Sequence, residues 1–186
     1  PIPGATPADH LILPGETHFA HLWQVTFGGE NAEAYWSFDG ARLCMQVRNE
    51  ERGWDCDRIS VTEADGRVDQ LSNGRGVTTC SYFMPDGQSV IFASTHAEHE
   101  TCPPPADRSQ GYVWQIHPEY DIYRHAFGTG DEAFVAGPGY DAEATVSPTG
   151  DRVVFTSTRS GDLELWTCDL SGGDLQQVTK APGYDG

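Results

Sequence analysis

The reactive residue types of this chain do not form the motifs that catalysis uses. No Gly-x-Ser-x-Gly elbow is present to expose a serine nucleophile, and no His-Glu-x-x-His pair to hold a catalytic zinc. The glycine-rich loops that cradle phosphates or dinucleotides are also missing. Serine, histidine and aspartate occur, but no spacing ties them together. We therefore predict that the chain is not an enzyme and uses no cofactor.

One short stretch carries residue types that ligate metals, namely His96, Glu98, His99, Glu100 and Cys102. A His-x-x-His pair with carboxylates is a possible zinc ligand set. Such a short cluster in a proline-rich loop is usually solvated instead. We predict no metal site.

The charge of the chain limits its partners. It has 11 basic and 28 acidic residues, which gives a formal net charge of −17. A chain this acidic repels nucleic-acid phosphates and anionic lipid headgroups, so nucleic acid is excluded as a partner. A basic protein surface or a divalent cation suits the charge better. The alternative is that the acidity only keeps the protein soluble. No apolar run approaches the length of a membrane span.

The elements that must position any site are short strands in repeated hairpins. Each hairpin reads as a strand, a tight turn with Asp-Gly or Thr-Gly, and a second strand. Three segments show this pattern: residues 34–45, 81–92 and 144–155.

Two further strands follow each hairpin, so each unit has four antiparallel strands. The turn glycines Gly40 and Gly87 are 47 residues apart, close to the length of one propeller blade. The next interval, to Gly150, is 63 residues, because an insertion at about 96–118 separates the second and third strands of the middle unit. A β-sandwich built from the same strands is the alternative, but it does not require a recurring four-strand unit.

The third unit resembles the propeller repeat of TolB-like proteins. That repeat has Ser-Pro-Asp-Gly, a basic residue, two or three apolar residues, Phe, a small residue and Ser. Here the pattern is Ser-Pro-Thr-Gly over 147–150, followed by Arg152, Val153, Val154, Phe155 and Ser157, and it continues through residues 159–166, 169–173 and 177–179. The resemblance covers roughly residues 20–186, and the first unit departs from it at Phe38, where Pro is usual.

The resemblance and the strand pattern together predict an all-β fold, a β-propeller of four-stranded antiparallel blades. We expect an N-terminal extended segment at 1–19 and blades at 31–73, 77–136 and 141–181. His21–Thr26 resembles the fourth strand of a blade and is expected to be a closing strand. Three blades and one closing strand leave apolar faces open, so we expect them to belong to a larger propeller of the six-bladed type, or a partner to cover those faces.

The resemblance implies a periplasmic or extracellular protein whose propeller holds protein partners. The first hypothesis is therefore a non-enzymatic binding or scaffold module, or an extrinsic subunit of a membrane-associated complex. Related blades also gate prolyl-oligopeptidase-like enzymes, whose catalytic residues lie on a separate domain. The alternative is thus a gating or regulatory fragment of an exported peptidase or other hydrolase.

In a propeller the first strand of each blade lines the central channel, and the loop before it opens on one face. Polar residues beside these first strands are therefore expected at the channel mouth, to bind a ligand, cation or peptide or only to close turns. They are Glu33, Thr78, Thr79, Asp141 and Glu143.

The insertion is expected to form an arm, because Pro103, Pro104 and Pro105 stiffen it as polyproline II. Tyr112, Trp114 and Tyr120 would give it an aromatic anchor for a partner, or would pack on their own blade.

The cysteines are expected to form one disulfide. Cys56, Cys80 and Cys102 lie at places that face one side of the blades, and Cys80–Cys102 is the favoured pair. Cys44 and Cys168 lie inside strands and are expected to be core thiols.

The core is expected between neighbouring blades. Its predicted members are Trp36, Phe38, Phe83, Ile91, Phe92, Val146, Val154 and Phe155.

Overall fold

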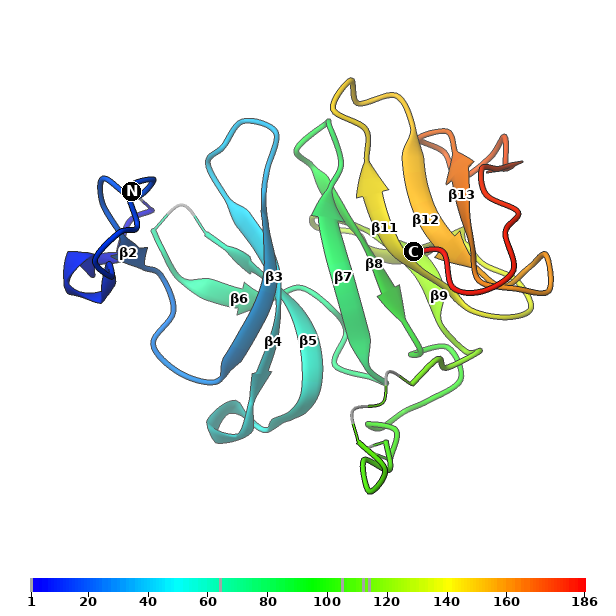
Figure 1. Ribbon diagram of the computed structural model, residues 1–186, viewed down its shortest axis with the longest axis horizontal. Coiled ribbons are helices and arrows are strands. Elements are labelled where there is room, and N and C mark those ends of the chain that lie inside the picture. Colours follow the sequence, from blue (N-terminus) through cyan, green and yellow to red (C-terminus); the bar gives the residue numbers. More distant parts are fainter. Residues whose placement is uncertain (1, 64, 105, 112, 114) are drawn as a thin grey trace.

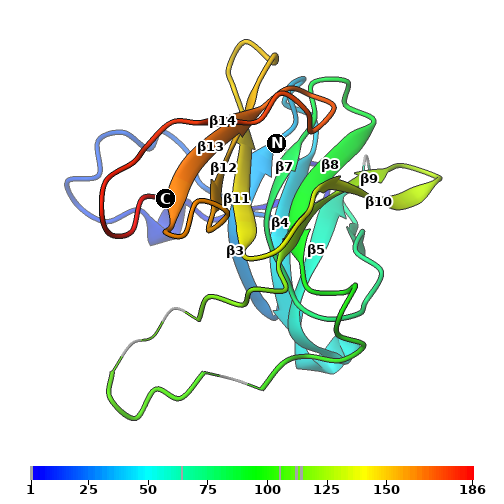
Figure 2. The same cartoon turned by 90° about the vertical axis from the view of Figure 1, so that its right-hand side faces the viewer.

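The computed structural model describes residues 2–186 except 64, 105, 112 and 114. Three four-stranded antiparallel sheets stand side by side as blades, with their first strands adjacent (Figures 1 and 2). This confirms the predicted all-β propeller fold. Among the described residues, no helix is long and apolar enough to cross a membrane.

Each blade runs in sequence order from its first strand to its fourth. The strands of blade 1 are β3 (Glu30–Trp36), β4 (Leu43–Asn49), β5 (Trp54–Thr62) and β6 (Val68–Gln70). Those of blade 2 are β7 (Thr78–Phe83), β8 (Ser89–Ser94), β9 (Asp121–Ala126) and β10 (Gly130–Val135). Those of blade 3 are β11 (Asp141–Val146), β12 (Val153–Ser157), β13 (Glu164–Cys168) and β14 (Gln176–Gln177).

The first turn of each blade uses the same local chemistry. Gly40, Gly87 and Gly150 have φ values of 68°, 63° and 70°, a region that favours glycine. In blade 3, the Gly150 amide donates to the Ser147 carbonyl at 2.8 Å. The repeated turn therefore follows from the Asp-Gly and Thr-Gly pairs of the sequence.

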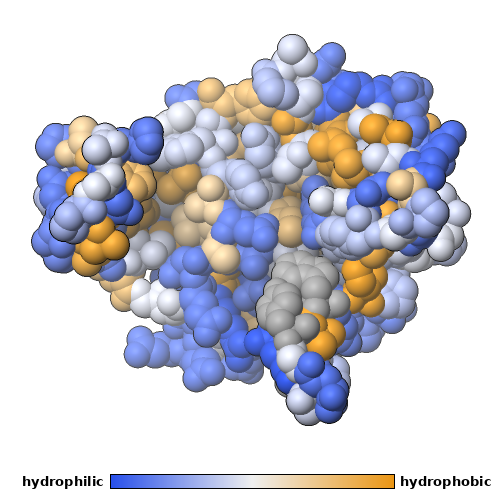
Figure 3. Space-filling view, viewed as in Figure 1, coloured by the Kyte–Doolittle hydropathy of each residue, from blue (hydrophilic) through white to orange (hydrophobic). Residues whose placement is uncertain are grey.

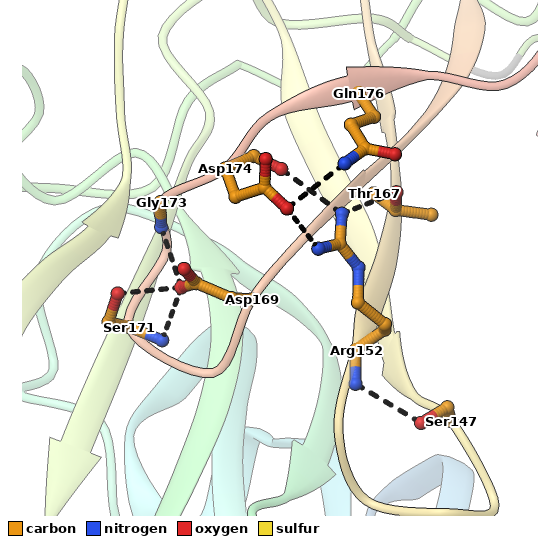
Figure 4. Close-up of polar contacts among 8 residues, drawn as sticks. All are labelled: Ser147, Arg152, Thr167, Asp169, Ser171, Gly173, Asp174 and Gln176. Carbon is orange, nitrogen blue, oxygen red and sulfur yellow. Dashed lines mark hydrogen bonds and ion pairs between the residues drawn. The ribbon is translucent and has the colours of Figure 1, made fainter.

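Arg152 and Asp169 stabilise the outer part of blade 3 (Figure 4). The Arg152 guanidinium pairs with Asp174 at 2.5 Å and donates to the Thr167 hydroxyl at 3.0 Å. Asp169 Oδ1 accepts the amides of Ser171 and Gly173 and so closes the β13–β14 turn. The residues of the family-like repeat thus serve structure in this blade.

Apolar side chains fill the spaces between blades. Ile91 and Phe92 alternate along β8, so that Phe92 packs toward blade 1 and Ile91 toward blade 3. Phe83, Phe92 and Phe155 are fully buried, as expected for the core. Cys44 and Cys168 are buried free thiols, also as expected.

Of the expected core residues, Val154 is only half-buried and two are exposed. Trp36 is 53% exposed and Phe38 is 45% exposed, so the expectation was wrong for both. All of β3 is exposed, whereas β7 and β11 are mostly buried. The reason is that β7 and β11 each pack against a preceding blade, and β3 has no such blade beside it among the described residues.

The N-terminal segment packs on the face of blade 1 that is turned away from blade 2. Ile2 and Val25 join Leu43, Met45 and Val47 in an apolar cluster. Within the expected closing strand only Trp23–Gln24 (β2) is extended, and it pairs with β1 (Thr6–Pro7) in a separate two-stranded sheet and not with any described blade. Short 3-10 turns occur at Asp9–Leu11 (η1) and Glu50–Arg52 (η2).

Candidate functional site

The first strand of each blade contains a bulge at the same place. The pairing register shifts between Ala32 and Tyr35 in β3, and at the equivalent places in β7 and β11. At each bulge one non-glycine residue adopts the left-handed conformation: Glu33 at φ 49°, Cys80 at 50° and Glu143 at 58°. Such residues are uncommon, and bulges redirect side chains near functional sites. Because the bulge recurs in all three blades, we take these positions on the first strands as the candidate functional site.

These three residues line one cavity of about 170 Å³ between the first strands of the blades. Its remaining lining residues are Tyr35, Ser81, Ala144 and Thr145. The side of the molecule on which the first strands lie faces the viewer in Figures 1 and 3. In Figure 3 its lower part, beneath blade 1, is largely hydrophilic.

The cavity is electrostatically one-sided. Its described lining residues include two carboxylates, Glu33 and Glu143, and no basic side chain. The Glu143 carboxylate accepts hydrogen bonds from the hydroxyls of Thr156 and Tyr184, each at 3.1 Å. Burial raises the pKa of the Cys80 thiol, and the Glu33 and Glu143 carboxylates raise it further. Cys80 is therefore a protonated thiol at neutral pH, with carboxylates on either side.

Ser81, which lines the cavity, has a buried and unsatisfied hydroxyl. Its side chain is 1% exposed, and its Oγ has no hydrogen-bond partner. Buried hydroxyls are normally paired, so an unpaired one beside a cavity calls for an explanation.

Three predicted site residues, Thr78, Thr79 and Asp141, instead make hydrogen bonds that connect strands or blades. The Thr78 hydroxyl donates to the Asp57 carbonyl at 3.0 Å, and the Thr79 hydroxyl donates to Gln46 Oε1 at 2.9 Å. Both bonds join blade 2 to blade 1. Of the five predicted residues, the structure places only Glu33 and Glu143 on the cavity.

Asp141 forms a buried ion pair within blade 3. Both carboxylate oxygens of Asp141 accept from Arg159 Nη2 at 2.8 Å. Burial raises the pKa of Asp141, and the bonds from Arg159 oppose that rise. The pair fixes the start of β11 against the loop that follows β12.

The insertion forms an arm between β8 and β9. It projects below the blades (Figure 1), on the side of the first strands and away from β10 (Figure 2). Tyr112 and Trp114 lie outside the described residues. Tyr120 is 7% exposed and packs edge-on against Tyr140, with ring centroids 5.8 Å apart, so it belongs to the packing between blades 2 and 3.

The disulfide joins Cys56 to Cys102, whereas the favoured pair Cys80–Cys102 was wrong. Cys80 lies at the β7 bulge and lines the cavity between the first strands. The base of the arm instead crosses the linker before β7, where Glu100 pairs with Arg75 at 2.6 Å. The disulfide therefore ties the arm of blade 2 to β5 of blade 1.

The residues of the insertion whose types could ligate a metal are engaged separately. His96 is buried, where Nδ1 lies 2.8 Å from the Ser94 hydroxyl and the ring packs on Tyr123. Cys102 is oxidised, and Glu100 pairs with Arg75. Within the described part of the chain, no group of three or more His, Cys, Asp or Glu residues is arranged to hold a metal.

Sequence reasoning missed Cys80 and Ser81 as cavity residues. A signal was present, because Glu33, Cys80 and Glu143 each stand seven residues before the turn glycine of their blade. Equal spacing from an equivalent turn places residues at equivalent positions in repeated blades. This periodicity, combined with polarity, would have selected the bulge positions.

The chain has the fold of β-propeller blades, and solved structures of TolB share that fold. One solved structure with this fold is a putative TolB from Agrobacterium tumefaciens, at 21% identity and TM-score 0.60, covering 84% of this chain and 51% of that one. A second is TolB from Acinetobacter baumannii, at 21% identity and TM-score 0.62, covering 86% and 35%. A chain of a nidogen/laminin complex follows, at 9% identity and TM-score 0.53, covering 81% and 48%.

The resemblance to TolB-like repeats is thereby confirmed at the level of the fold. This chain spans 51% and 35% of the lengths of the two TolB chains. No protein-family profile and no curated protein matches the sequence.

Proposed function

We propose that this chain is a non-enzymatic protein-binding or scaffold module that holds its partner on the side where β3, β7 and β11 lie. The observation that carries the proposal is the cavity between these strands, whose described lining residues include Glu33 and Glu143 and no basic residue. Carboxylates gathered in a hollow of one sign of charge attract a positively charged group more strongly than a single surface carboxylate does. The partner chemistry that fits is a basic segment of another protein.

The rigid placement of the site supports binding. Glu33, Cys80 and Glu143 lie within strands and not on loop tips. Hydrogen bonds from Thr78 and Thr79, together with the Cys56–Cys102 disulfide, hold blades 1 and 2 together. A preorganised site loses little conformational entropy when a partner binds.

The proposed location is the periplasm or the cell surface, where the module would act alone or as an extrinsic subunit of a membrane-associated complex. Support comes from the Cys56–Cys102 disulfide, because disulfides persist in oxidising compartments. The TolB-like fold is consistent with this location.

The test is site-specific photo-crosslinking of the protein in its native host. A photoreactive amino acid replaces Tyr35 at the cavity, or Val178, which is 57% exposed beyond β14, as a control position. We expect a discrete protein adduct from position 35 whose crosslinked segment is rich in Lys or Arg. Glu33→Gln should reduce this adduct, whereas Glu132→Gln, at an exposed site on β10, should not.

Equal adducts from both positions would contradict the proposal. So would a position-35 adduct that survives Glu33→Gln unchanged. A hydrolase domain recovered on the same polypeptide would favour the alternative of a gating fragment.

A further inference from the structure

Asn73 connects the linker before β7 (residues 71–77) to blade 2. Its Nδ2 donates to Asp131 Oδ2 on β10 at 3.1 Å, and the other oxygen of that carboxylate lies 2.6 Å from His125 Nδ1. The Asn73 Oδ1 accepts the amide of Arg75 at 2.9 Å. A neutral side-chain amide therefore lies directly against a carboxylate of the neighbouring blade.

The residue after Asn73 makes this amide chemically reactive. Asn73 is the only asparagine of the chain that glycine follows, whereas Asn31 precedes alanine and Asn49 precedes glutamate. Glycine has no Cβ to hinder the approach of its own backbone nitrogen to the preceding side chain. Asn73 is exposed to water, and the Gly74 amide makes no hydrogen bond to another described residue. The groups that would react are thus adjacent and accessible.

We propose that Asn73 is a site of spontaneous deamidation, a modification that weakens the contact between blades 1 and 2. The Gly74 nitrogen loses its proton and attacks Cγ of Asn73. The new N–Cγ bond closes a succinimide ring, the Cγ–Nδ2 bond breaks, and Nδ2 leaves as ammonia. Water then opens the ring at either carbonyl carbon and gives aspartate or isoaspartate. The net reaction exchanges ammonia for water and needs no oxidant or reductant.

Both products place a negative charge in front of Asp131. The hydrogen bond from Asn73 Nδ2 is lost, and two carboxylates face each other in its place. The Asp131 side chain is only 11% exposed, so water screens the repulsion incompletely. The contact between the linker and β10 therefore changes from attractive to repulsive.

Isoaspartate has a second effect, because it lengthens the backbone by one carbon. The linker has no room for this at Gly76, where an added Cβ would lie 2.6 Å from Thr95 Oγ1 and 2.9 Å from the His96 amide nitrogen. The Gly76 carbonyl also accepts the Arg58 guanidinium. Since Gly76 is held on two sides, we expect the extra length to displace residues 71–75 from blade 2.

The experiment is incubation of the whole folded protein at pH 8.5 and at pH 5, followed by peptide mass spectrometry. Loss of a backbone proton precedes the attack, so conversion should be faster at pH 8.5. We expect Asn73 to become a mixture of aspartate and isoaspartate before Asn31 or Asn49 changes detectably. Asn73→Gln is the matched control, because it keeps the amide but its longer side chain closes the ring poorly. Conversion of Asn73 no faster than of Asn31 and Asn49, or only in urea, would overturn the proposal.

Two variants test the effect on the contact between the blades. Asn73→Asp supplies the charged product directly, and amide exchange in residues 71–77 and β10 should be about tenfold faster than in wild type, because a hydrogen bond to a charged group is lost. Adding Asp131→Asn removes the opposing charge and should return exchange toward the wild-type rate. Exchange in β11–β13 should not change.

Equal exchange in wild type and Asn73→Asp would contradict a weakened contact. Equal exchange with and without Asp131→Asn would contradict the repulsion between the two carboxylates. None of these measurements involves a bound partner, so the modification site stands or fails independently of the proposed function.

Discussion

At the residue scale, the bulges of the first strands determine which side chains line the cavity. A left-handed non-glycine residue costs of order 1–3 kcal/mol unless its surroundings hold it in place. Three blades carry this cost at the same position, at Glu33, Cys80 and Glu143. The consequence is that two carboxylates and a thiol meet in one cavity, where burial and the two carboxylates raise the pKa of the thiol.

Cys80 reports on this environment through its alkylation rate. The thiolate is the reactive form, and nearby carboxylates raise the pKa of Cys80. Glu33→Gln removes one of these charges, so the pKa should fall and alkylation by iodoacetamide at pH 8.5 should be about three- to tenfold faster. Mass spectrometry of the native protein checks the rate at Cys80, with Glu132→Gln as the control. A rate unchanged by Glu33→Gln would show that burial alone sets the pKa.

Asp57 should make stability depend on pH. Burial raises the pKa of its carboxyl, and Glu30 and Glu33 raise it further. A raised folded-state pKa means that wild type loses stability as pH rises through that pKa. Asp57→Asn cannot ionise, so it should be more stable than wild type at pH 7 and equal to it near pH 3. Urea unfolding at the two pH values checks this, and an equal stability difference at both would contradict it.

At the scale of elements, the base of the arm and the linker before β7 connect blade 2 to blade 1. The Cys56–Cys102 bond crosses from β5 of blade 1 to the insertion of blade 2, closing 46 residues of chain. The Arg58 guanidinium donates to the Gly76 carbonyl beside it. The arm therefore begins from a fixed base, although its tip projects away from the blades (Figure 2).

Loss of this disulfide should loosen the arm and leave blade 3 intact. For a loop of this length, Cys56→Ser with Cys102→Ser should cost roughly 3–4 kcal/mol of unfolding free energy. Amide exchange should quicken in residues 97–119 and in the linker before β7, but not in β11–β13. Chemical denaturation and exchange mass spectrometry measure the two effects. Faster exchange throughout blade 3 would show that the disulfide stabilises the whole array instead.

At the scale of the whole molecule, stability resides in the spaces between blades. Each blade buries apolar side chains against its neighbour, because one twisted sheet cannot cover both of its faces. Blade 3 meets blade 2 through Phe155, Val153 and Ile91. Blade 1 meets blade 2 through Ile59, Val61 and Phe83. The array therefore behaves as a chain of nearest-neighbour contacts.

Two aromatic residues test this arrangement. Phe155 is fully buried between blades 2 and 3, so Phe155→Ala should cost roughly 3–5 kcal/mol as a cavity in a packed site. Trp36 is 53% exposed, so Trp36→Ala should cost less than about 1 kcal/mol. Denaturant titration of both variants measures the difference. A similar cost for the two would mean that a further element covers Trp36 in solution.

Local sequence patterns determined the architecture of this protein. Asp39-Gly40 and Asp86-Gly87 specify tight turns through their own backbone preferences. Consecutive apolar residues such as Ile91 and Phe92 point to opposite faces of a strand and so specify a strand buried on both faces. These signals act within a few residues, so the four-strand unit and its repetition could be predicted from the sequence. The position of the insertion followed from the same turn spacing.

Only the tertiary structure decided the contacts that depend on neighbours distant in sequence. The partner of Cys102 depended on where the arm crosses blade 1, and the exposure of Trp36 and Phe38 depended on which blade stands beside β3. Glu33, Ser81 and Glu143 share a cavity because blades 1, 2 and 3 turn their bulges to the same side. Residue type and local spacing do not predict these contacts, because the contacts are set by how the sheets pack against one another.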